Sequence, residues 1–191
     1  MKKSLLAMLL AVALVAPVFA ADKGSKELDI KAGVTVMPKC DVDSKSGDVD
    51  ASFLAELDFF YYVMPELAIG AGVNNIFNAK IKDVPGDPKI GFTNIYAQAK
   101  YVFDLNDDLF NNIYPLVQIG YGIVNLDTDF YDVDSNGIYW GIGAGTTIKE
   151  NFVFEILYSQ NKGTMKTKGY PSTFDATYSA LQIKVGYKFN F

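Results

Sequence analysis

The last ten residues, Gln182 to Phe191, read QIKVGYKFNF and alternate large apolar side chains with polar or small ones. A period of two is typical of a β-strand whose two faces meet different surroundings. The chain also ends on an aromatic residue, Phe191, although chain ends usually fray into water, where polar residues suit them better. The segment therefore predicts a strand whose apolar face, including the final ring, lies against something other than water.

The same alternation recurs along the chain, so the sequence predicts eight strands. They cover residues 28–36, 51–62, 67–74, 93–103, 115–124, 138–148, 152–159 and 178–191. Their connections alternate in length: residues 63–66 and 149–151 are tight and 104–112 is moderate, whereas 38–48, 75–90, 125–136 and 160–175 are long and polar. In an antiparallel meander, odd and even connections lie at opposite ends. Short turns at one end and long loops at the other indicate an eight-stranded antiparallel up-and-down transmembrane β-barrel.

A soluble sandwich would show the same alternation, with the apolar face as its core. Three features favour the membrane barrel. The polar face is rich in Gly, Asn and Gln, which suits a narrow interior. The longer predicted strands run to about ten residues or more, the length that crosses a bilayer when tilted. Aromatic residues also gather at the short-turn ends of the strands, as in a girdle at a membrane interface: Phe59, Tyr61, Tyr101, Phe103, Phe152, Tyr187, Phe189 and Phe191.

The first twenty residues have the features of a cleaved secretory signal peptide. Lys2 and Lys3 are followed by an apolar run and by Val18-Phe19-Ala20, the small-x-small pattern of a cleavage site. We expect cleavage after residue 20 and a barrel domain over residues 27–191. Because the apolar run is shorter than the ~20 residues of a membrane-spanning helix, an anchor is disfavoured.

Composition excludes several function classes. The formal net charge is −5 and becomes more negative once Lys2 and Lys3 are removed, so nucleic acid is excluded as a partner. A single cysteine, Cys40, permits no internal disulfide. The chain contains no histidine, which removes the commonest general base and the commonest zinc ligand.

These residues together resemble the small eight-stranded outer-membrane barrels of the OmpA/OmpX-like family, including its porin-family and opacity-type members. The resemblance implies the bacterial outer membrane as the location, with outer-membrane lipid around the barrel. It also implies that the barrel-assembly machinery reads the C-terminal segment, here Tyr187, Phe189 and Phe191. The family includes adhesins, serum-resistance proteins and envelope stabilisers, so it implies a fold and a location more than one activity.

We therefore expect an envelope or surface protein with a filled lumen, which acts through four external loops on an unknown external partner. We expect a monomer that needs no cofactor and is not an enzyme. The alternative is a small porin-like channel for water-soluble solutes. A lipid-modifying enzyme is the third hypothesis, but without histidine a Ser-His dyad cannot exist.

Seven charged residues of the polar faces are candidates for a charge network in the lumen, because their predicted heights in the barrel are compatible. They are Lys31, Glu56, Asp58, Lys100, Glu155, Lys184 and Lys188. Buried charges without partners would cost several kcal/mol each, so three acids and four bases predict a paired plug. The alternative places them near the barrel mouth, hydrated and independent.

One loop has half of a calcium-binding motif. Asp132, Asp134 and Asn136 match the first positions of an EF-hand loop, but Gly143 occupies the position of its bidentate Glu, and no helix flanks it. We therefore expect a polar external loop that ends in an Asn-Gly turn, and at most loose binding of divalent cations. The alternating glycines nearby are expected to make room in the lumen, and Cys40 is expected to be an incidental loop residue.

Overall fold

The computed structural model describes residues 23–191, apart from 43–44, 83–87, 106, 108, 128–130, 136 and 168–172. Among these described residues, no helix is long and apolar enough to cross a membrane. Eight long strands form the wall: β1 (Lys26–Val42), β3 (Phe53–Tyr62), β4 (Leu67–Lys80), β5 (Lys89–Tyr101), β7 (Phe110–Asp127), β9 (Gly137–Ile148), β10 (Phe152–Thr167) and β11 (Thr173–Asn190).

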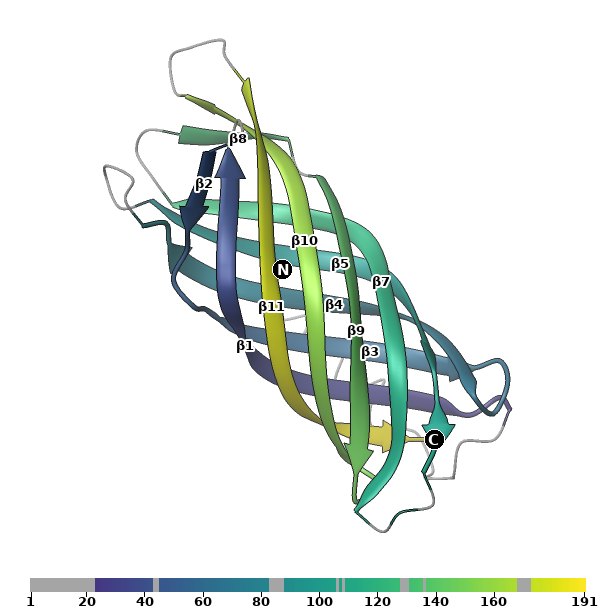
Figure 1. Cartoon of the computed structure of the whole chain (residues 1–191). Helices are drawn as coiled ribbons and strands as arrows, with labels where there is room; N and C mark the ends of the chain where they lie inside the picture. The colour runs from purple at the N-terminus through teal and green to yellow at the C-terminus, as the bar shows by residue number, and fades with distance from the viewer. Residues whose placement is uncertain are drawn as a thin grey trace, which may run out of the picture.

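The eight strands close into one antiparallel barrel. Each pairs with its neighbour in the order β11-β1-β3-β4-β5-β7-β9-β10, and β10 pairs with β11 to close the ring. The strands run obliquely around the axis, and the C-terminus lies at the end where the short turns gather (Figure 1). The predicted fold class is therefore confirmed.

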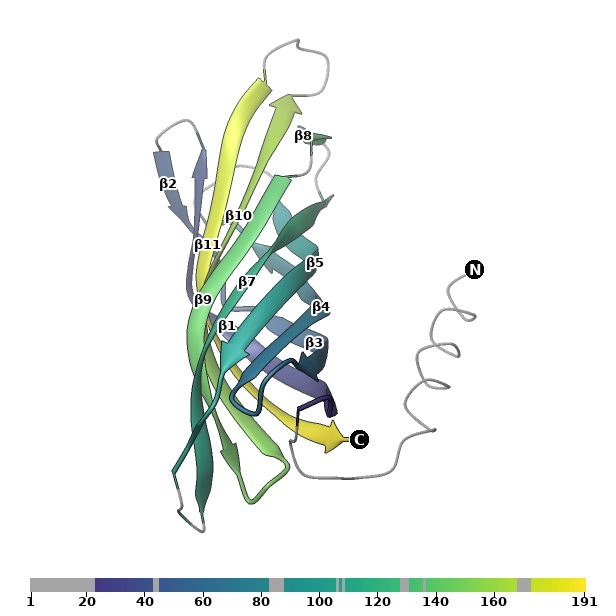
Figure 2. The ribbon, with the colours of Figure 1, turned by 90° about the vertical axis from the view of Figure 1, so that its right-hand side faces the viewer.

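Three short strands extend this wall. β2 (Lys45–Asp48) pairs with β1, β6 (Phe103–Asp104) pairs with β7, and β8 (Tyr131–Ser135) pairs with β10. β2 and β8 lie at the end opposite the short turns, where the hairpins project beyond the barrel (Figure 2).

The strands continue into the segments that the sequence predicts as long loops. β10 and β11, for example, stay paired from Thr164↔Asp175 to Lys166↔Thr173, with both partners inside the predicted loop 160–175. The prediction was wrong there because it followed the alternation of hydrophobicity, which depends on lipid outside the strand. Backbone ladder hydrogen bonds need no lipid and persist beyond the membrane.

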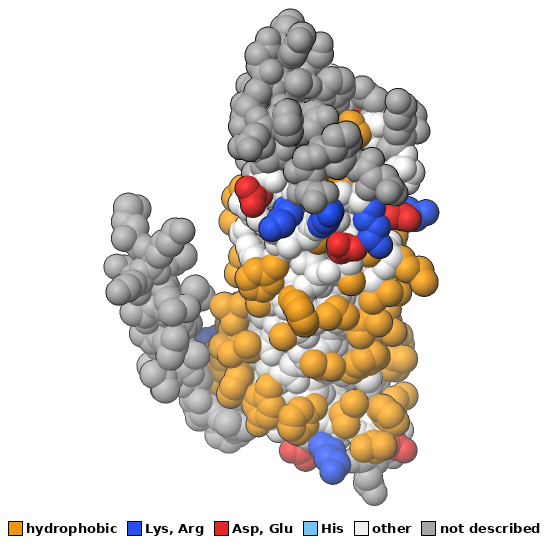
Figure 3. Space-filling view, turned by 90° about the vertical axis from the view of Figure 1, so that its left-hand side faces the viewer, with side chains coloured by type: hydrophobic (Ala, Val, Ile, Leu, Met, Phe, Trp, Pro, Cys, Tyr) orange, Lys and Arg blue, Asp and Glu red, His pale blue; other side chains and the backbone are white. Residues whose placement is uncertain are grey.

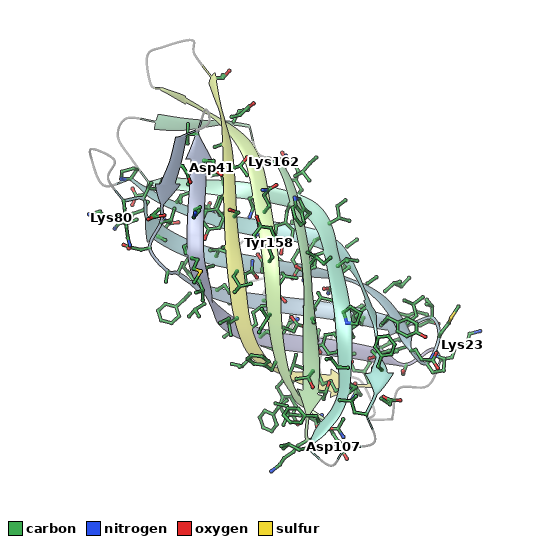
Figure 4. The ribbon with its side chains drawn as sticks, in the orientation of Figure 1. Lys23, Asp41, Lys80, Asp107, Tyr158 and Lys162 are labelled. Atoms are coloured by element: carbon green, nitrogen blue, oxygen red, sulfur yellow. The ribbon has the colours of Figure 1, made fainter. Side chains whose placement is uncertain are left out.

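The outer surface of the barrel is apolar, as a membrane barrel requires and a soluble sandwich does not. On β11, Val185 is 58% exposed whereas the neighbouring Lys184 is 0% exposed. The exposed apolar side chains form a broad band, with charged side chains gathered at its two borders (Figure 3). Figure 4 places Lys23 and Asp107 at one end of the molecule and Asp41, Lys80 and Lys162 toward the other.

The predicted aromatic residues pack against one another on the outer face near the short turns. The ring centroids of Tyr187 and Phe189 lie 4.9 Å apart, and those of Phe152 and Tyr187 lie 5.6 Å apart. The ring of Phe191 lies 6.3 Å from that of Phe59. The Phe191 backbone also exchanges two hydrogen bonds with Lys26, at 2.8 and 2.9 Å, so the last residue is held against the first barrel strand.

Candidate functional site: the barrel interior

Two lysines at the centre of the barrel share three carboxylates. The Lys31 ammonium lies 2.8 Å from Glu56, 2.6 Å from Asp58 and 2.8 Å from Glu155. The Lys184 ammonium lies 2.7 Å from Glu56 and 2.9 Å from Glu155. All five side chains are fully buried. We call these five residues the central ion cluster.

Tyrosines from two further strands complete the central ion cluster. The Tyr96 hydroxyl, on β5, donates a hydrogen bond of 2.9 Å to Asp58, and the Tyr114 hydroxyl, on β7, donates one of 3.0 Å to Glu155. The carboxylates themselves come from β3 and β10. Each of these hydrogen bonds therefore passes over one intervening strand, and it supplements the ion pairs, as buried charges require.

A second group of charges surrounds Glu27 closer to the short turns, and we call it the lower ion cluster. Lys100 forms an ion pair with one Glu27 oxygen, and the Tyr62 hydroxyl donates a hydrogen bond of 2.8 Å to the other. Lys188 lies 3.9 Å from Glu27. The Lys100 ammonium also lies 4.0 Å from the centroid of the Phe60 ring, within the range of a cation–π interaction.

The seven charged residues proposed from the sequence therefore occupy two groups. Five form the central ion cluster, whereas Lys100 and Lys188 lie in the lower ion cluster. Glu27, the acid at the centre of the lower ion cluster, was not among the predicted residues, because the first predicted strand began at Leu28. The parity of the strand could have found it, since Glu27, Asp29 and Lys31 alternate with outward-facing residues.

A layer of amides and hydroxyls adjoins the central ion cluster. Asn94 donates to Asn74 at 2.8 Å, and Tyr139 donates to Gln118 at 2.6 Å. Glycine leaves space for these larger side chains: a Cβ at Gly122 would lie 2.8 Å from the Asn94 side-chain oxygen. The interior at this level is thus occupied by polar side chains that bond to one another.

The interior near the long hairpins is apolar, which the sequence analysis did not predict. The outer apolar cluster consists of Cys40, Val49, Leu54, Ile76, Ala79, Ile81, Ile90, Phe92, Ala176, Tyr178 and Ala180. Phe92 and Tyr178 pack with ring centroids 4.7 Å apart. Many of these residues fall inside or beside the segments predicted as loops, so their inward orientation could not be read from the alternation. Cys40, predicted as incidental, is buried in this cluster.

The remaining sequence candidates lie elsewhere. Tyr187 and Phe189 are exposed on the outer face, away from the lumen. Asp132 and Asp134 belong to β8, but their side chains, together with all of Asn136, lie outside the described residues. Within the part of the chain that the structure describes, no group of three or more Cys, Asp or Glu side chains is placed to hold a metal ion.

A closed barrel of eight antiparallel strands with an apolar outer band is the architecture of a small outer-membrane protein. The family model "Outer membrane protein beta-barrel domain" matches residues 5–191, and the chain belongs to this family. It is accordingly a protein of the bacterial outer membrane. A comparison with curated proteins finds no match.

Solved structures show the same fold. The barrel is similar to the outer membrane protein OprG from Pseudomonas aeruginosa, with a TM-score of 0.56 and 13% identity over 91% of this chain and 99% of that one. It is also similar to Neisserial surface protein A, with a TM-score of 0.56 and 18% identity over 87% of this chain and 99% of that one. At these identities the likeness establishes the fold alone.

Proposed function

We propose that this protein is a closed outer-membrane barrel whose lumen is filled by its own side chains. It acts as a surface or envelope protein, in adhesion, surface protection or structural support, through the four connections on its external side. The observation that carries this proposal is the central ion cluster, in which Lys31 and Lys184 hold carboxylates from β3 and β10 with all five side chains fully buried.

Two barriers in series support a closed lumen. A solute that enters from the external side first meets the outer apolar cluster, which offers no hydration to an ion. It then meets the ion clusters, whose buried pairs would have to separate. Eight strands enclose a space just wide enough for side chains, so little room remains beside them. The external hairpins are then the part of the protein available to a partner.

The small channel is the second candidate, because one buried carboxyl, that of Asp29, has no hydrogen-bond partner among the described residues. Asp29 is 0% exposed, and neither of its oxygens has a hydrogen-bond partner among the described residues. Among the residues that the structure describes, five buried carboxyls, counting Asp29, accompany four buried lysines. A buried carboxyl without a hydrogen-bond partner could offer a cation a place to bind along a path through the lumen.

Solute flux separates the two candidates. Liposomes that contain the purified barrel are placed in an isotonic solution of a small sugar, and an open porin serves as the positive control. The closed barrel predicts swelling at the rate of protein-free liposomes, whereas sugar entry that rises with the amount of barrel would establish the channel.

A further inference from the structure

Asp29 is a buried acid of the barrel interior that belongs to neither ion cluster. Its side chain faces inward from β1, between Glu27 of the lower ion cluster and Lys31 of the central ion cluster. It is 0% exposed, and among the described residues no donor gives a hydrogen bond to either of its oxygens. An ionised carboxylate is costly to bury without such donors, so the ionised form of Asp29 is disfavoured in the lumen.

The surroundings of Asp29 include two other acids. The Glu27 carboxyl group is close enough to form a hydrogen bond with it, and Asp58 is its register partner on β3. Its register partner on β11 is Lys188, whose ammonium lies 3.9 Å from Glu27. Ionised carboxylates can only accept hydrogen bonds. Asp29 and Glu27 can therefore bond to each other only if one of them carries a proton.

The distribution of partners identifies which acid carries it. Glu27 forms an ion pair with Lys100, and Asp58 lies 2.6 Å from the Lys31 ammonium, so nearby cations favour the ionised form of both. Asp29 has no such ion pair among the described residues. With five buried carboxyls and four buried lysines in this part of the chain, one proton on Asp29 also balances the buried charges.

Charged and titratable groups face Asp29 from five strands. They are Glu27 and Lys31 on β1, Asp58 and Tyr62 on β3, Lys100 on β5, Tyr114 on β7 and Lys188 on β11. The lysines among them are engaged by other carboxylates, one in the central ion cluster and two in the lower ion cluster. The hydrogen-bond acceptor that remains within reach of a protonated Asp29 is Glu27.

We propose that Asp29 is a binding site for a single proton, which it shares with Glu27 in the folded barrel at neutral pH. Asp29 donates the hydrogen bond, and the ionised Glu27 accepts it. On unfolding, both groups meet water, and Asp29 releases the proton because an unfolded aspartate has a pKa of about 3.9. Folding is therefore linked to the uptake of one proton. This proton site is independent of whether the lumen conducts.

Infrared spectroscopy of the folded barrel in lipid vesicles detects the proton directly, because a carboxylic acid and a carboxylate absorb at separate positions. At neutral pH we expect a protonated-carboxyl band in the wild type that is absent from Asp29→Asn. The matched control is Asp175→Asn, at an exposed position on β11, which should retain the band. A wild-type spectrum without the band, or a band that Asp29→Asn leaves unchanged, would overturn the proposal.

Urea titrations between about pH 5 and 7 test the linkage. The unfolding equilibrium constant of the wild type, divided by that of Asp29→Asn, should rise about tenfold per pH unit, because the folded wild type holds one proton more than its unfolded state. Stability from this site thus falls as the pH rises. The same ratio for Asp175→Asn against the wild type should not change. A ratio that depends on sodium concentration instead of pH would assign the position to a cation and overturn the proposal.

A measurement on the wild type alone covers the case in which Asp29→Asn does not fold. The barrel is labelled with ¹³C at its aspartate carboxyl carbons and followed by NMR over the same pH range. We expect one aspartate signal to stay at the position of a protonated carboxyl. If every aspartate signal lies at the ionised position at neutral pH, no aspartate holds the proton and the proposal is wrong.

Discussion

Lys31 and Glu155 are 124 positions apart in the chain, and the Lys31 ammonium lies 2.9 and 2.8 Å from the two Glu155 carboxylate oxygens. Their strands, β1 and β10, are not neighbours, because β11 lies between them. Gly186 on β11 is the register partner of Lys31, and it has no side chain to obstruct the lysine. The ion pair therefore crosses one strand and connects the first strand of the barrel to the seventh.

Glu155→Gln should destabilise the barrel. It leaves Lys31 and Lys184 with less negative charge, and loss of one partner from a buried ion pair typically costs about 3–5 kcal/mol. We expect the free energy of unfolding, measured by urea titration in lipid vesicles, to fall by about 3 kcal/mol.

The exposed Glu150→Gln serves as the control for that measurement and should change stability by less than about 0.5 kcal/mol. Coupling within the cluster is tested by adding Lys184→Gln. If Glu155→Gln, Lys184→Gln and the double variant all unfold at the wild-type urea concentration, the lumen charges are not coupled and the plug argument fails.

Gly186→Ala should disturb the same ion pair without changing any charge. A Cβ at this position would lie 2.4 Å from Lys31 Cγ and 2.5 Å from the Ile30 carbonyl oxygen, so the lysine chain and its strand must shift. Such overpacking typically costs about 1–3 kcal/mol. At Gly47, the nearest atom to an added Cβ is 3.6 Å away, which makes Gly47→Ala the matched control. Equal urea midpoints for the two variants would argue against a fixed path of Lys31 over Gly186.

Deletion of Phe191 should lower the amount of barrel in the outer membrane more than trimming of residues 163–170 does. The deletion removes the two backbone hydrogen bonds to Lys26 and the ring beside Phe59, and it shortens the segment that the assembly machinery is expected to read. Heat-dependent gel migration of outer-membrane fractions measures the folded amount. Equal levels of the two variants would reject this role for the last residue.

Asp107 should make the stability of the β6–β7 turn dependent on pH. Its carboxylate accepts hydrogen bonds of 2.9 Å from the backbone N–H groups of Phe110 and Leu109, which lower its pKa. Because the pKa of Asp107 is lower in the folded state, its contribution to the stability of the fold is complete above the pKa of the unfolded state, about 3.9. That contribution is lost as the pH falls through the lower pKa of the folded state.

The stability difference between the wild type and Asp107→Ala measures that contribution. It should be constant from pH 5 to 7 and shrink in more acidic solution. A difference that stays the same at about pH 2 would show that the carboxylate does not stabilise the turn through its charge.

The fold could be predicted from the sequence wherever lipid borders the strand, because lipid outside and side chains inside impose the alternation. The pattern at Val185, Tyr187 and Phe189 is of this kind. Ala176 and Ile90 lie beyond the apolar band and face inward, and there the alternation no longer distinguishes a strand from a loop. The sequence therefore predicted all eight strands but underestimated their length at the external end.

The interior could be predicted by residue type but not by partner. The inward position of Lys31 and Glu155 follows from the period of each strand. The ion pair between Lys31 and Glu155 passes over Gly186, so it depends on the register between β1, β11 and β10. The sequence of a single strand does not determine that register. Glu27 was missed by one residue at a strand boundary, where such predictions are weakest. The outer apolar cluster requires three-dimensional closure and left no sequence signal.

Single-channel recording in a planar lipid bilayer tests the filled lumen most directly. Purified barrel is inserted from proteoliposomes, insertion is verified by heat-dependent gel migration of the recovered protein, and an open porin is recorded under the same conditions. Because the ion clusters and the outer apolar cluster close the lumen, we expect a current at the level of the protein-free bilayer. Steady, large openings of the wild-type barrel would contradict it and would establish the protein as a channel.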